Sequence, residues 1–460
     1  MSETLLSVGL DVGTTTTQLV VSRLTVENRA SSFTVPDMEI TQRQILYRGQ
    51  VHFTPLLGKD LVDGAGVRAI VENEYARAGI TRQQVDTGAV IITGETSRKE
   101  NAAAVLNALS DIAGDFVVAT AGPDLESMLA AKGAGAVAYS AQTGKRVLHM
   151  DIGGGTSNLA LIDAGKIVRT GCLNVGGRLI KLDEEGVIIY ISPVLTGLCE
   201  LKIGQKPTKE ALEKLAQSLA RALEMAAGLE ARTHLLDDLL TRETAAGWEA
   251  PTLGAVISFS GGVADCIEKE APGDFGDIGP QLGRAIRESL LCRGKYILGQ
   301  ETIRATVIGA GCHSAQLSGS TVFCRGVELP VKNLPVVRFD RKEQEQSDLD
   351  LLIRQRLAQA DAEHLVLFLP GYPAADYGQV KQLAKAILRG TDGRQVIVCL
   401  EADMAKALGT AICLEADKEL PCLCIDRLRL DGDSYLDIGA PVGPCLPVVI
   451  KTLVLERRTI

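Results

Sequence analysis

The chain has 460 residues, of which 46% are hydrophobic and 23% are charged, which excludes a disordered chain. At roughly 100–200 residues per domain, this length predicts two to four globular domains. Forty-eight basic and 57 acidic residues give a net charge of −9 with no long Lys/Arg run, which disfavours nucleic acid or an anionic membrane surface as the main partner.

An internal repeat is the strongest feature of the sequence. Residues 8–21, VGLDVGTTTTQLVV, align without a gap with residues 148–161, LHMDIGGGTSNLAL, at an offset of 140 residues. In each copy an apolar strand, at 5–10 or 146–150, ends at an acidic residue. A turn rich in Gly, Thr or Ser then leads into a second apolar run, which is typical of a tight loop with exposed backbone N–H groups. The repeat predicts two similar halves that open with the same strand–turn–strand unit.

The segments after the first copy alternate between helical and strand patterns. The expected elements are helices at 61–78, 101–109 and 125–138 and strands at 89–93 and 116–119. Residues 97–100, SRKE, have the spacing of a capping box before the second of these helices. The last helix would join the two halves, and its small Ala and Gly side chains would allow close helix packing.

The segments after the second copy continue this alternation. We expect a helix at 209–229, a strand at 255–259 before a Ser-Gly-Gly turn, and a strand at 305–308 before a Gly-Ala-Gly turn and a helix. From about residue 320 the expected elements are strands at 365–369, 396–400 and 423–425 and helices at 380–388 and 402–408. This last alternation predicts a separate small α/β module.

The two acidic turns suggest a nucleotide site. Asp11 and Asp151 could hold a hydrated Mg²⁺, and the turns offer backbone N–H groups and hydroxyls to phosphate oxygens. Two such turns facing one another would clamp a nucleoside triphosphate from both sides. Neither the Walker pattern GxxxxGK[ST] nor the dinucleotide pattern GxGxxG occurs in these turns. One Asp-x-Gly-Thr could be a plain hairpin turn, whereas the duplicated set is a strong signal.

These motifs resemble the actin, Hsp70 and sugar-kinase ATPase superfamily over about residues 5–318. The similar segments are the first phosphate motif (11–16), the second phosphate motif (151–156), the adenosine motif (260–262) and two connecting helices (125–138 and 308–314). The resemblance implies an α/β fold of two duplicated ribonuclease H-like domains around a nucleotide cleft. The boundaries we expect are 1–140 and 141–318 for the two ATPase subdomains and 319–460 for the C-terminal α/β module.

Further segments resemble one family over the whole chain. ITQRQILYRGQVHFTPL (40–56), ITGETSRKENA (92–102) and DIGAPVGPCLPVVIKTLVL near the end, together with the two repeat copies, resemble the EutA family of ethanolamine ammonia-lyase reactivating factors. The resemblance implies an ATP-dependent, chaperone-like protein of ethanolamine utilization. Such a protein releases damaged cobalamin from the lyase so that adenosylcobalamin can replace it.

The same resemblance implies ATP and Mg²⁺ as cofactors, slow ATP hydrolysis and ethanolamine ammonia-lyase as the protein partner. Adenosylcobalamin would be involved indirectly, because no DxHxxG cobalamin-ligand motif is present. The expected location is the cytoplasm, with association with a bacterial microcompartment left open.

The resemblance also implies roles for individual residues. Asp11 and Asp151 would lie near the Mg²⁺ and the attacking water. The residues along the phosphates would be Gly13, Thr14, Thr15 and Thr16 on one side and Gly153, Gly154, Gly155 and Thr156 on the other. Gly261 and Gly262 would let the adenosine lie against bare backbone.

Glu126 is the candidate for orienting the attacking water, and the alternative is an ordinary solvent-facing helix residue. Two positions depart from the superfamily pattern and leave the rate of hydrolysis in question. Asn158 stands where Hsp70-like proteins have a second Asp after the turn, and residues 122–124 read Gly-Pro-Asp in place of the usual Glu-Pro start.

Two other functions are compatible with a nucleotide clamp. A small-molecule kinase of the same superfamily would need an aspartate base for the acceptor hydroxyl, and no motif identifies one. A filament protein of the actin type ranks last, because no polymer-forming segment can be recognised.

Membrane and disulfide signals are weak. No run of 18 apolar residues is present, so no membrane span is expected. Asp11 interrupts the short apolar run at the start of the chain, so no signal peptide is expected either. The 11 cysteines are scattered, and only Cys422 and Cys424 form a close pair. We therefore predict buried thiols in a reducing compartment, with a metal role for the close pair as the less favoured alternative.

Overall fold

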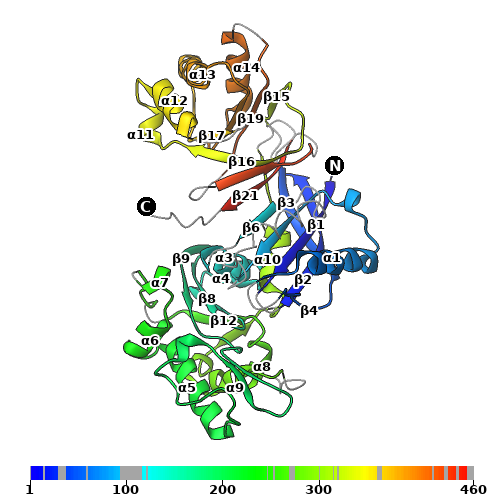
Figure 1. The fold of residues 1–460 in the computed structure, drawn as a ribbon. Helices are drawn as coiled ribbons and strands as arrows, with labels where there is room; N and C mark the ends of the chain where they lie inside the picture. Colours follow the sequence, from blue (N-terminus) through cyan, green and yellow to red (C-terminus); the bar gives the residue numbers. More distant parts are fainter. Residues whose placement is uncertain are drawn as a thin grey trace.

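The computed structural model describes residues 2–13, 16–29, 38–57, 61–93, 117–120, 123–245, 247–251, 254–268, 275–299, 301–313, 315–318, 321–359, 365–416, 419–428, 434–441 and 445–452. Three large β-sheets carry the fold (Figure 1). The sheet built from the N-terminal strands lies in the middle of an elongated molecule. The sheet of the second repeat lies towards one end, and the C-terminal unit forms the other end (Figure 1).

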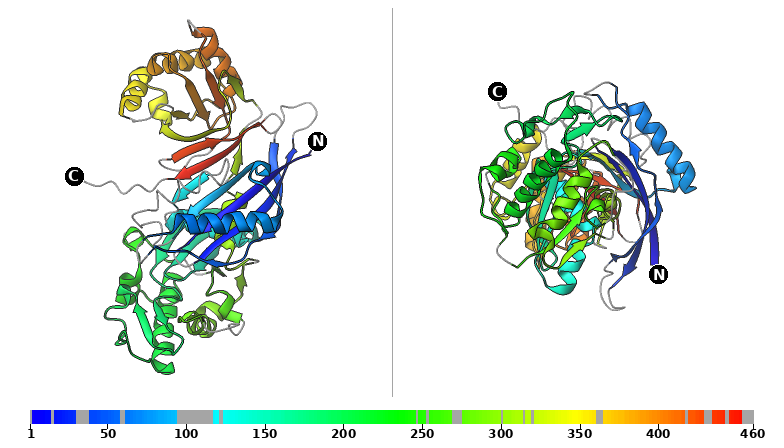
Figure 2. Two further views of the ribbon diagram at one scale, coloured as in Figure 1. Left: turned by 45° about the vertical axis from the view of Figure 1, so that its right-hand side comes forward. Right: turned by 90° about the horizontal axis from the view of Figure 1, so that it is seen from below.

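The first unit is a sheet in the order β3-β2-β1-β5-β6, with β4 paired to β2. Its elements are β1 (Ser2–Val12), β2 (Thr16–Asn28), β3 (Met38–Arg48), β4 (His52–Phe53), α1 (Gly64–Ala78), β5 (Thr87–Ile92) and β6 (Val117–Thr120). Helix α1 begins where the Asp63 side chain accepts hydrogen bonds from the N–H groups of Ala65 and Gly66. It ends at Gly79, whose φ of 68° suits a left-handed helix cap, and it covers the outer face of the sheet (Figure 2).

The second unit repeats this topology in the order β9-β8-β7-β12-β13. Its strands are β7 (Val147–Ile152), β8 (Ser157–Asp163), β9 (Lys166–Leu173), β12 (Val256–Ser260) and β13 (Tyr296–Leu298), with a separate hairpin of β10 (Ile180–Leu182) and β11 (Ile188–Ile191). Its helices are α5 (Lys209–Ala226), α6 (His234–Leu239), α7 (Arg242–Ala245), α8 (Asp265–Glu268) and α9 (Gly279–Glu288). Short 3-10 helices occur at Arg82–Gln84, Pro193–Leu195 and Leu290–Cys292.

The duplication predicted from the sequence is confirmed strand by strand. In both units the first three strands are antiparallel, and two further strands run parallel to the first. The registers also match, because Asp11 lies opposite Gln18 and Asp151 lies opposite Asn158. This is the ribonuclease H-like strand order. The predicted fold class, two duplicated units of the actin-like ATPase type followed by a C-terminal α/β unit, is therefore correct.

Three helices fill the space between the two sheets: α3 (Pro123–Gly133), α4 (Ala136–Thr143) and α10 (Ala305–His313). Helices α3 and α10 cross with almost no side chain between them. A Cβ on Gly133 would stand 1.9 Å from the carbonyl oxygen of Ala305, and one on Gly309 would stand 2.0 Å from that of Leu129. The small residues expected to permit close packing therefore do so.

Two predicted elements in this region were wrong in detail. The helix expected at 125–138 is broken into α3 and α4, because Gly135 takes a left-handed φ of 81°. The strand expected at 305–308 is the first turn of α10. A run as short as Ala305–Ile308 does not distinguish a buried strand from a buried helix, and here the glycines that follow allow a helix to pack against α3 and β1.

The C-terminal unit is a sheet in the order β14-β21-β20-β16-β17-β18-β19-β15, in which β16 to β19 are parallel. Its strands are β14 (Ala315–Leu317), β15 (Phe323–Arg325), β16 (Val331–Arg338), β17 (Val366–Leu369), β18 (Val396–Leu400), β19 (Cys422–Ile425), β20 (Ser434–Ile438) and β21 (Pro447–Thr452). Its helices are α11 (Arg341–Gln344), α12 (Leu349–Gln359), α13 (Tyr377–Thr391) and α14 (Ala405–Glu415). The strand–helix alternation predicted for this region is confirmed.

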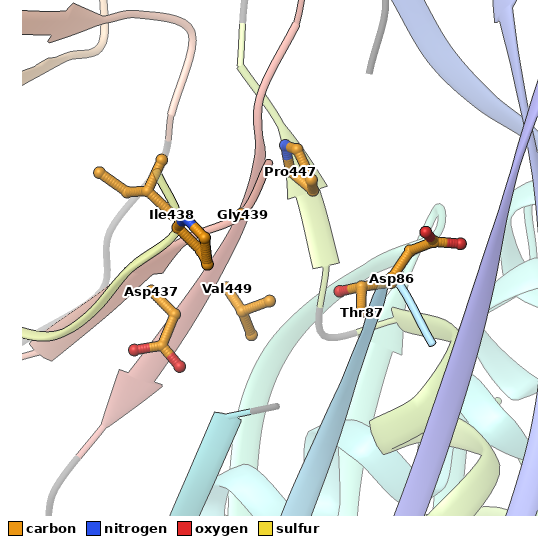
Figure 3. A pocket seen from close by; sticks show the side chains of 8 residues that line it. Asp86, Thr87, Asp437, Ile438, Gly439, Pro447 and Val449 are labelled. Atoms are coloured by element: carbon orange, nitrogen blue, oxygen red, sulfur yellow. The ribbon is translucent and has the colours of Figure 1, made fainter. Parts of the chain in front are cut away.

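The C-terminal unit is anchored on the first unit through β21. Val449 of β21 belongs to a buried cluster with Ala89 and Ile91 of β5 and with residues of α3 and α10. At the edge of this contact Asp86 and Thr87, at the start of β5, face β20 and β21 across a small cavity (Figure 3). The C-terminal unit thus packs on the same central elements that join the two repeats.

The remaining structural expectations have mixed outcomes. The helix expected at 101–109 and its capping box lie outside the described residues. No helix in the described part of the chain is long and apolar enough to cross a membrane. All 11 cysteines are thiols, and the Sγ atoms of Cys422 and Cys424 lie 3.8 Å apart on β19. No cluster of three or more His, Cys, Asp or Glu side chains suited to a metal ion occurs in the described ranges.

Candidate functional site

The two repeat aspartates lie near one another at the carboxyl ends of their strands. Asp11 on β1 is half-buried and accepts a hydrogen bond from the Thr93 hydroxyl at 2.8 Å. Burial raises the pKa of Asp11 to about 7, the Thr93 hydrogen bond opposes that rise, and the nearby charge of Asp151 adds to it. The structure therefore brings both predicted metal-binding carboxylates into one electrostatic environment, although they are 140 residues apart in sequence.

Asp151 is the more deeply buried carboxylate, with 8% of its surface exposed. Ser260 donates a hydrogen bond to its Oδ1 at 2.5 Å, and Thr306 of α10 donates one to its Oδ2 at 3.3 Å. Burial raises the pKa of Asp151, and these two bonds oppose the rise. The Ser260 hydroxyl is held in turn by His149 Nε2 at 3.0 Å. Burial lowers the pKa of His149 to about 3, so this imidazole is neutral at neutral pH.

The two turns close with the same hydrogen bond. Gly13 N–H donates to the carbonyl oxygen of Thr16 at 2.9 Å, and Gly153 N–H donates to that of Thr156 at 2.9 Å. In the first turn the Thr54 hydroxyl also donates to the Gly13 carbonyl at 2.7 Å. The other two predicted phosphate residues of this turn, Thr14 and Thr15, lie outside the described residues.

The second turn is held by backbone hydrogen bonds from the segment 176–178. Gly177 N–H donates to the Gly153 carbonyl at 3.0 Å, and Arg178 N–H donates to the Gly154 carbonyl at 2.6 Å. A Cβ on Gly176 would stand 2.3 Å from that Gly154 oxygen, so the segment can approach only as glycine. Gly155, at the tip of the turn, is exposed. The turn is thus fixed at its carbonyl side while its tip faces solvent.

The predicted adenosine motif lies beside the second turn. Gly261 follows β12 with a φ of 87°, and a Cβ there would stand 2.2 Å from the carbonyl oxygen of Ile152. Only glycine meets both conditions. Gly262 is exposed next to it. The structure therefore brings the Ser-Gly-Gly segment to the strand end that carries Asp151.

Glu126 is buried on α3, with 7% of its surface exposed, so the solvent-facing alternative is wrong. The Asn158 side-chain amide donates a hydrogen bond to Glu126 Oε2 at 2.8 Å. Asn158 is the residue paired with Asp151 in the β7–β8 register. The departure from the Hsp70-like pattern therefore places an amide donor, where those proteins have a carboxylate, beside the candidate water-orienting residue.

The donors around the two aspartates fit a hydrated magnesium ion. Two buried amide oxygens, Gln18 Oε1 and Asn158 Oδ1, have no hydrogen-bond partner among the described residues, and each lies opposite one of the aspartates. Hard oxygen donors of this kind suit Mg²⁺, which usually binds one or two carboxylates and keeps several waters.

Sequence reasoning did not identify four residues that complete the site. Thr54, Thr93 and Thr306 hold the turn or the aspartates, and Arg178 lies against the second turn. Only the position of Thr93, directly after a buried strand, could have suggested it. The other three come from elements whose neighbours depend on the tertiary fold.

The family model and the two curated relatives give the same result. The family of ethanolamine utilisation proteins EutA matches residues 3–456. The ethanolamine ammonia-lyase reactivase EutA of Salmonella typhimurium strain LT2 is 39% identical over 466 aligned positions, covering 98% of each chain. The reactivase EutA of Escherichia coli strain K12 is 38% identical over 471 aligned positions, again covering 98% of each chain. Among solved structures, the Ppx/GppA family member of Aquifex aeolicus is 12% identical with a TM-score of 0.43, covering 67% of this chain and 97% of its own.

Proposed function

The chain belongs to the EutA family of ethanolamine utilisation proteins, and from that premise we propose that it is an ATP-dependent reactivating factor for ethanolamine ammonia-lyase. The identity of 39% over 98% of both chains is the observation that carries the proposal. The protein would drive the exchange of inactive cobalamin for adenosylcobalamin on the lyase. A small-molecule kinase is the weaker alternative, because both curated relatives are named as reactivases.

The nucleotide part of this proposal is supported by the duplicated turns. Asp11 and Asp151 would hold the magnesium ion, largely through water. When bound, this ion would neutralise charge on the phosphates and draw electron density from the bond that breaks. The backbone N–H groups of the two turns, other than those of Gly13 and Gly153 that close the turns, would bind phosphate oxygens from opposite sides.

The water that attacks the terminal phosphate would be oriented by Glu126. Its carboxylate is buried and fixed by the Asn158 amide, so it points in one direction before substrate binds. A carboxylate in this position can accept a proton from water as the bond to phosphorus forms. Ser260 and Thr93 would keep the two aspartates in place during that step.

The crossing of α3 and α10 could transmit a conformational change from the nucleotide site to the surface that binds the partner. Helices α3 and α10 contact both sheets and the C-terminal strand β21. We therefore propose that a change at the turns alters the relative position of the units, and that the lyase binds the moving surfaces. We also propose the boundaries 1–140, 141–318 and 319–460 for the units, with β14 (Ala315–Leu317) joining the C-terminal sheet across the last boundary, and a cytoplasmic location.

The test is a reactivation assay with ethanolamine ammonia-lyase inactivated by cyanocobalamin. Activity should return on addition of this protein, ATP, Mg²⁺ and adenosylcobalamin together, and omission of any one should prevent it. A non-hydrolysable ATP analogue should support binding to the lyase without repeated turnover. Failure of the complete mixture to restore activity would count against the assignment.

A further inference from the structure

Arg178 links the two repeat units beside both turns. Its backbone N–H is bonded to Gly154 of the second turn, and its guanidinium carbon lies 5.6 Å from the ring centroid of Phe53. Phe53 is in β4 and is paired with Thr16, at the end of the first turn. One residue therefore contacts the second turn through its backbone and the first unit through its side chain.

The backbone of Arg178 is held firmly, whereas its side chain has freedom at the tip. A Cβ on Gly177 would stand 3.0 Å from the Cα of Gly279, so the segment fits closely against the start of α9. The guanidinium Nε donates to Asp277 Oδ2 at 3.2 Å, and Asp277 Oδ1 accepts from the Gly279 N–H at 2.8 Å. Neither terminal nitrogen of Arg178 has a hydrogen-bond partner in the described part of the chain.

The charges around the turns favour a role for this guanidinium in phosphate binding. Asp11 and Asp151 are acidic groups that lie near one another at the proposed phosphate site and supply no positive charge, so a bound triphosphate needs a cation in addition to one magnesium ion. A guanidinium presents a planar fork that matches a phosphate with two parallel hydrogen bonds. Its contact with an aromatic ring that is 75% exposed is a weak interaction by comparison. A phosphate within reach would therefore displace the ring as the partner of Arg178.

We propose that Arg178 is a further nucleotide-contacting residue, whose terminal nitrogens leave the Phe53 ring to bind the terminal phosphates of a nucleoside triphosphate. This inference rests on the proposed function, because it assumes that the two turns bind a nucleotide. In the nucleotide-free form Arg178 covers part of Phe53, and in the triphosphate form it uncovers that ring. The state of the nucleotide would thereby change the surface around β4.

The experiment is calorimetric titration of ATP, ADP and AMP in the presence of Mg²⁺. Arg178→Gln should weaken ATP binding at least about tenfold, weaken ADP binding less and change AMP binding by no more than about twofold. Arg178→Lys keeps the charge without the fork and should fall between the wild type and Arg178→Gln for ATP. Arg169→Gln is the matched control, because Arg169 pairs with Glu249 on the surface of the same unit, and it should bind ATP like the wild type.

Phe53→Leu tests the proposed exchange of partners. It removes the ring and keeps apolar bulk, so ATP binding should stay within about threefold of the wild type. A loss as large as that of Arg178→Gln would contradict the exchange, because it would mean that the ring is needed in the bound state.

The possible failures are distinguishable. Wild-type ATP affinity in Arg178→Gln, or an equal loss for ATP and AMP, would overturn the role of Arg178 while leaving the proposed function intact. A wild-type protein that binds no ATP would overturn the proposed function itself. Thermal unfolding of each variant reports on its folding. Should Arg178→Gln not fold, Arg178→Lys decides the matter, and unchanged ATP affinity in that variant overturns the proposal.

Discussion

The first and second turns have the same register but are supported by different parts of the fold. Asp11 faces Gln18 and Asp151 faces Asn158 at equivalent points of the two hairpins. Gln18 donates its amide to the Ile303 carbonyl at 3.2 Å, before α10, whereas Asn158 donates to the Glu126 carboxylate. The same hairpin thus binds the connecting segment in one unit and the candidate water-orienting residue in the other.

The hydroxyls that hold the two aspartates also come from different positions. Ser260 lies directly beside Asp151 in the parallel register, whereas the residue beside Asp11 is the buried Ile91. In the first unit Thr93, two positions later, takes over the hydrogen bond. The two strand ends therefore match in topology, but Asp151 is more buried than Asp11 and accepts side-chain hydrogen bonds from both Ser260 and Thr306. Two units with the same topology can therefore give equivalent aspartates different burial and different hydrogen-bond partners.

The largest effect should come from removing either aspartate. Asp11→Asn and Asp151→Asn should each lower ATP-dependent reactivation of the lyase at least about 100-fold, because each removes a carboxylate proposed to hold the magnesium ion. The reactivation assay measures this, and thermal unfolding tests whether the variants are folded. Full activity in either variant would refute the role of the replaced aspartate as a metal ligand. It would also show that the two turns do not contribute equally to the site.

Changes at Glu126 and Asn158 should affect turnover more than binding. Glu126→Gln should lower the rate of ATP hydrolysis by about 100-fold, because an amide cannot accept the proton of the attacking water. Asn158→Ala should lower it by about tenfold through loss of the bond that orients Glu126. The equivalent change in the first unit, Gln18→Ala, should have a smaller effect on hydrolysis. Steady-state phosphate release and calorimetry together separate rate from affinity, and equal effects of Asn158→Ala and Gln18→Ala would contradict the proposed difference between the units.

A methyl group at the helix crossing should destabilise the protein. Gly133→Ala places a Cβ 1.9 Å from the carbonyl oxygen of Ala305, so α3 and α10 must separate, and the free energy of unfolding should fall by about 3 kcal/mol. Gly294→Ala is the control, because a Cβ there meets nothing within 4 Å, and it should change stability by less than about 0.5 kcal/mol. Denaturant unfolding measures both, and equal stability of the two variants would mean that the crossing is not tight.

A smaller and pH-dependent effect is expected at Glu74, which anchors the segment before Thr54 in the first unit. The fully buried Glu74 carboxylate accepts hydrogen bonds from Tyr47 at 2.8 Å, the backbone of Gln50 at 3.1 Å and His52 at 2.9 Å. Burial raises the pKa of Glu74, but these hydrogen bonds outweigh burial, and the net pKa is lowered.

Because the folded-state pKa of Glu74 lies below its unfolded value, its contribution to stability is present above pH ~4.5 and is lost as the pH falls through the folded value. Glu74→Gln should cost about 2 kcal/mol at pH 7, and this difference from the wild type should shrink as the pH falls below about 4. Denaturant unfolding at a series of pH values tests this. A difference that is constant from pH 7 to pH 3 would show that the charge of Glu74 contributes nothing.

Much of the local structure could be read from the sequence because its signals are local. The apolar runs of β1, β7, β12, β17 and β18 are bounded by turn residues, and the structure has strands at each of them. Alternating polar strands such as β3 and the short strands β14 and β15 carry weaker signals and were not predicted. The strand expected at 305–308 failed because a short apolar run has no periodicity to separate strand from helix.

The site was predictable where backbone geometry demands a residue type. Aspartate at a strand end and glycine at 261 can be recognised from the sequence, because few other residue types could bind a metal ion or adopt the backbone conformation required there. The hydrogen-bond partners of those residues cannot be recognised in this way, since Thr, Asn and Arg occur throughout any chain. In the sequence, Asn158 stood out only because Hsp70-like proteins have Asp at that position. The structure shows that its amide donates a hydrogen bond to Glu126, the candidate water-orienting residue.

By itself, the sequence determined that the chain contains one strand–turn–strand unit twice, with an acidic side chain at each strand end and a turn of Gly and Thr residues after it. Only the tertiary structure decided which hydroxyls and amides support each carboxylate, and that Arg178 lies between the units. The physical reason is that strand propensity and turn geometry act over a few residues. The environment of a buried charge depends on side chains that distant segments bring to it.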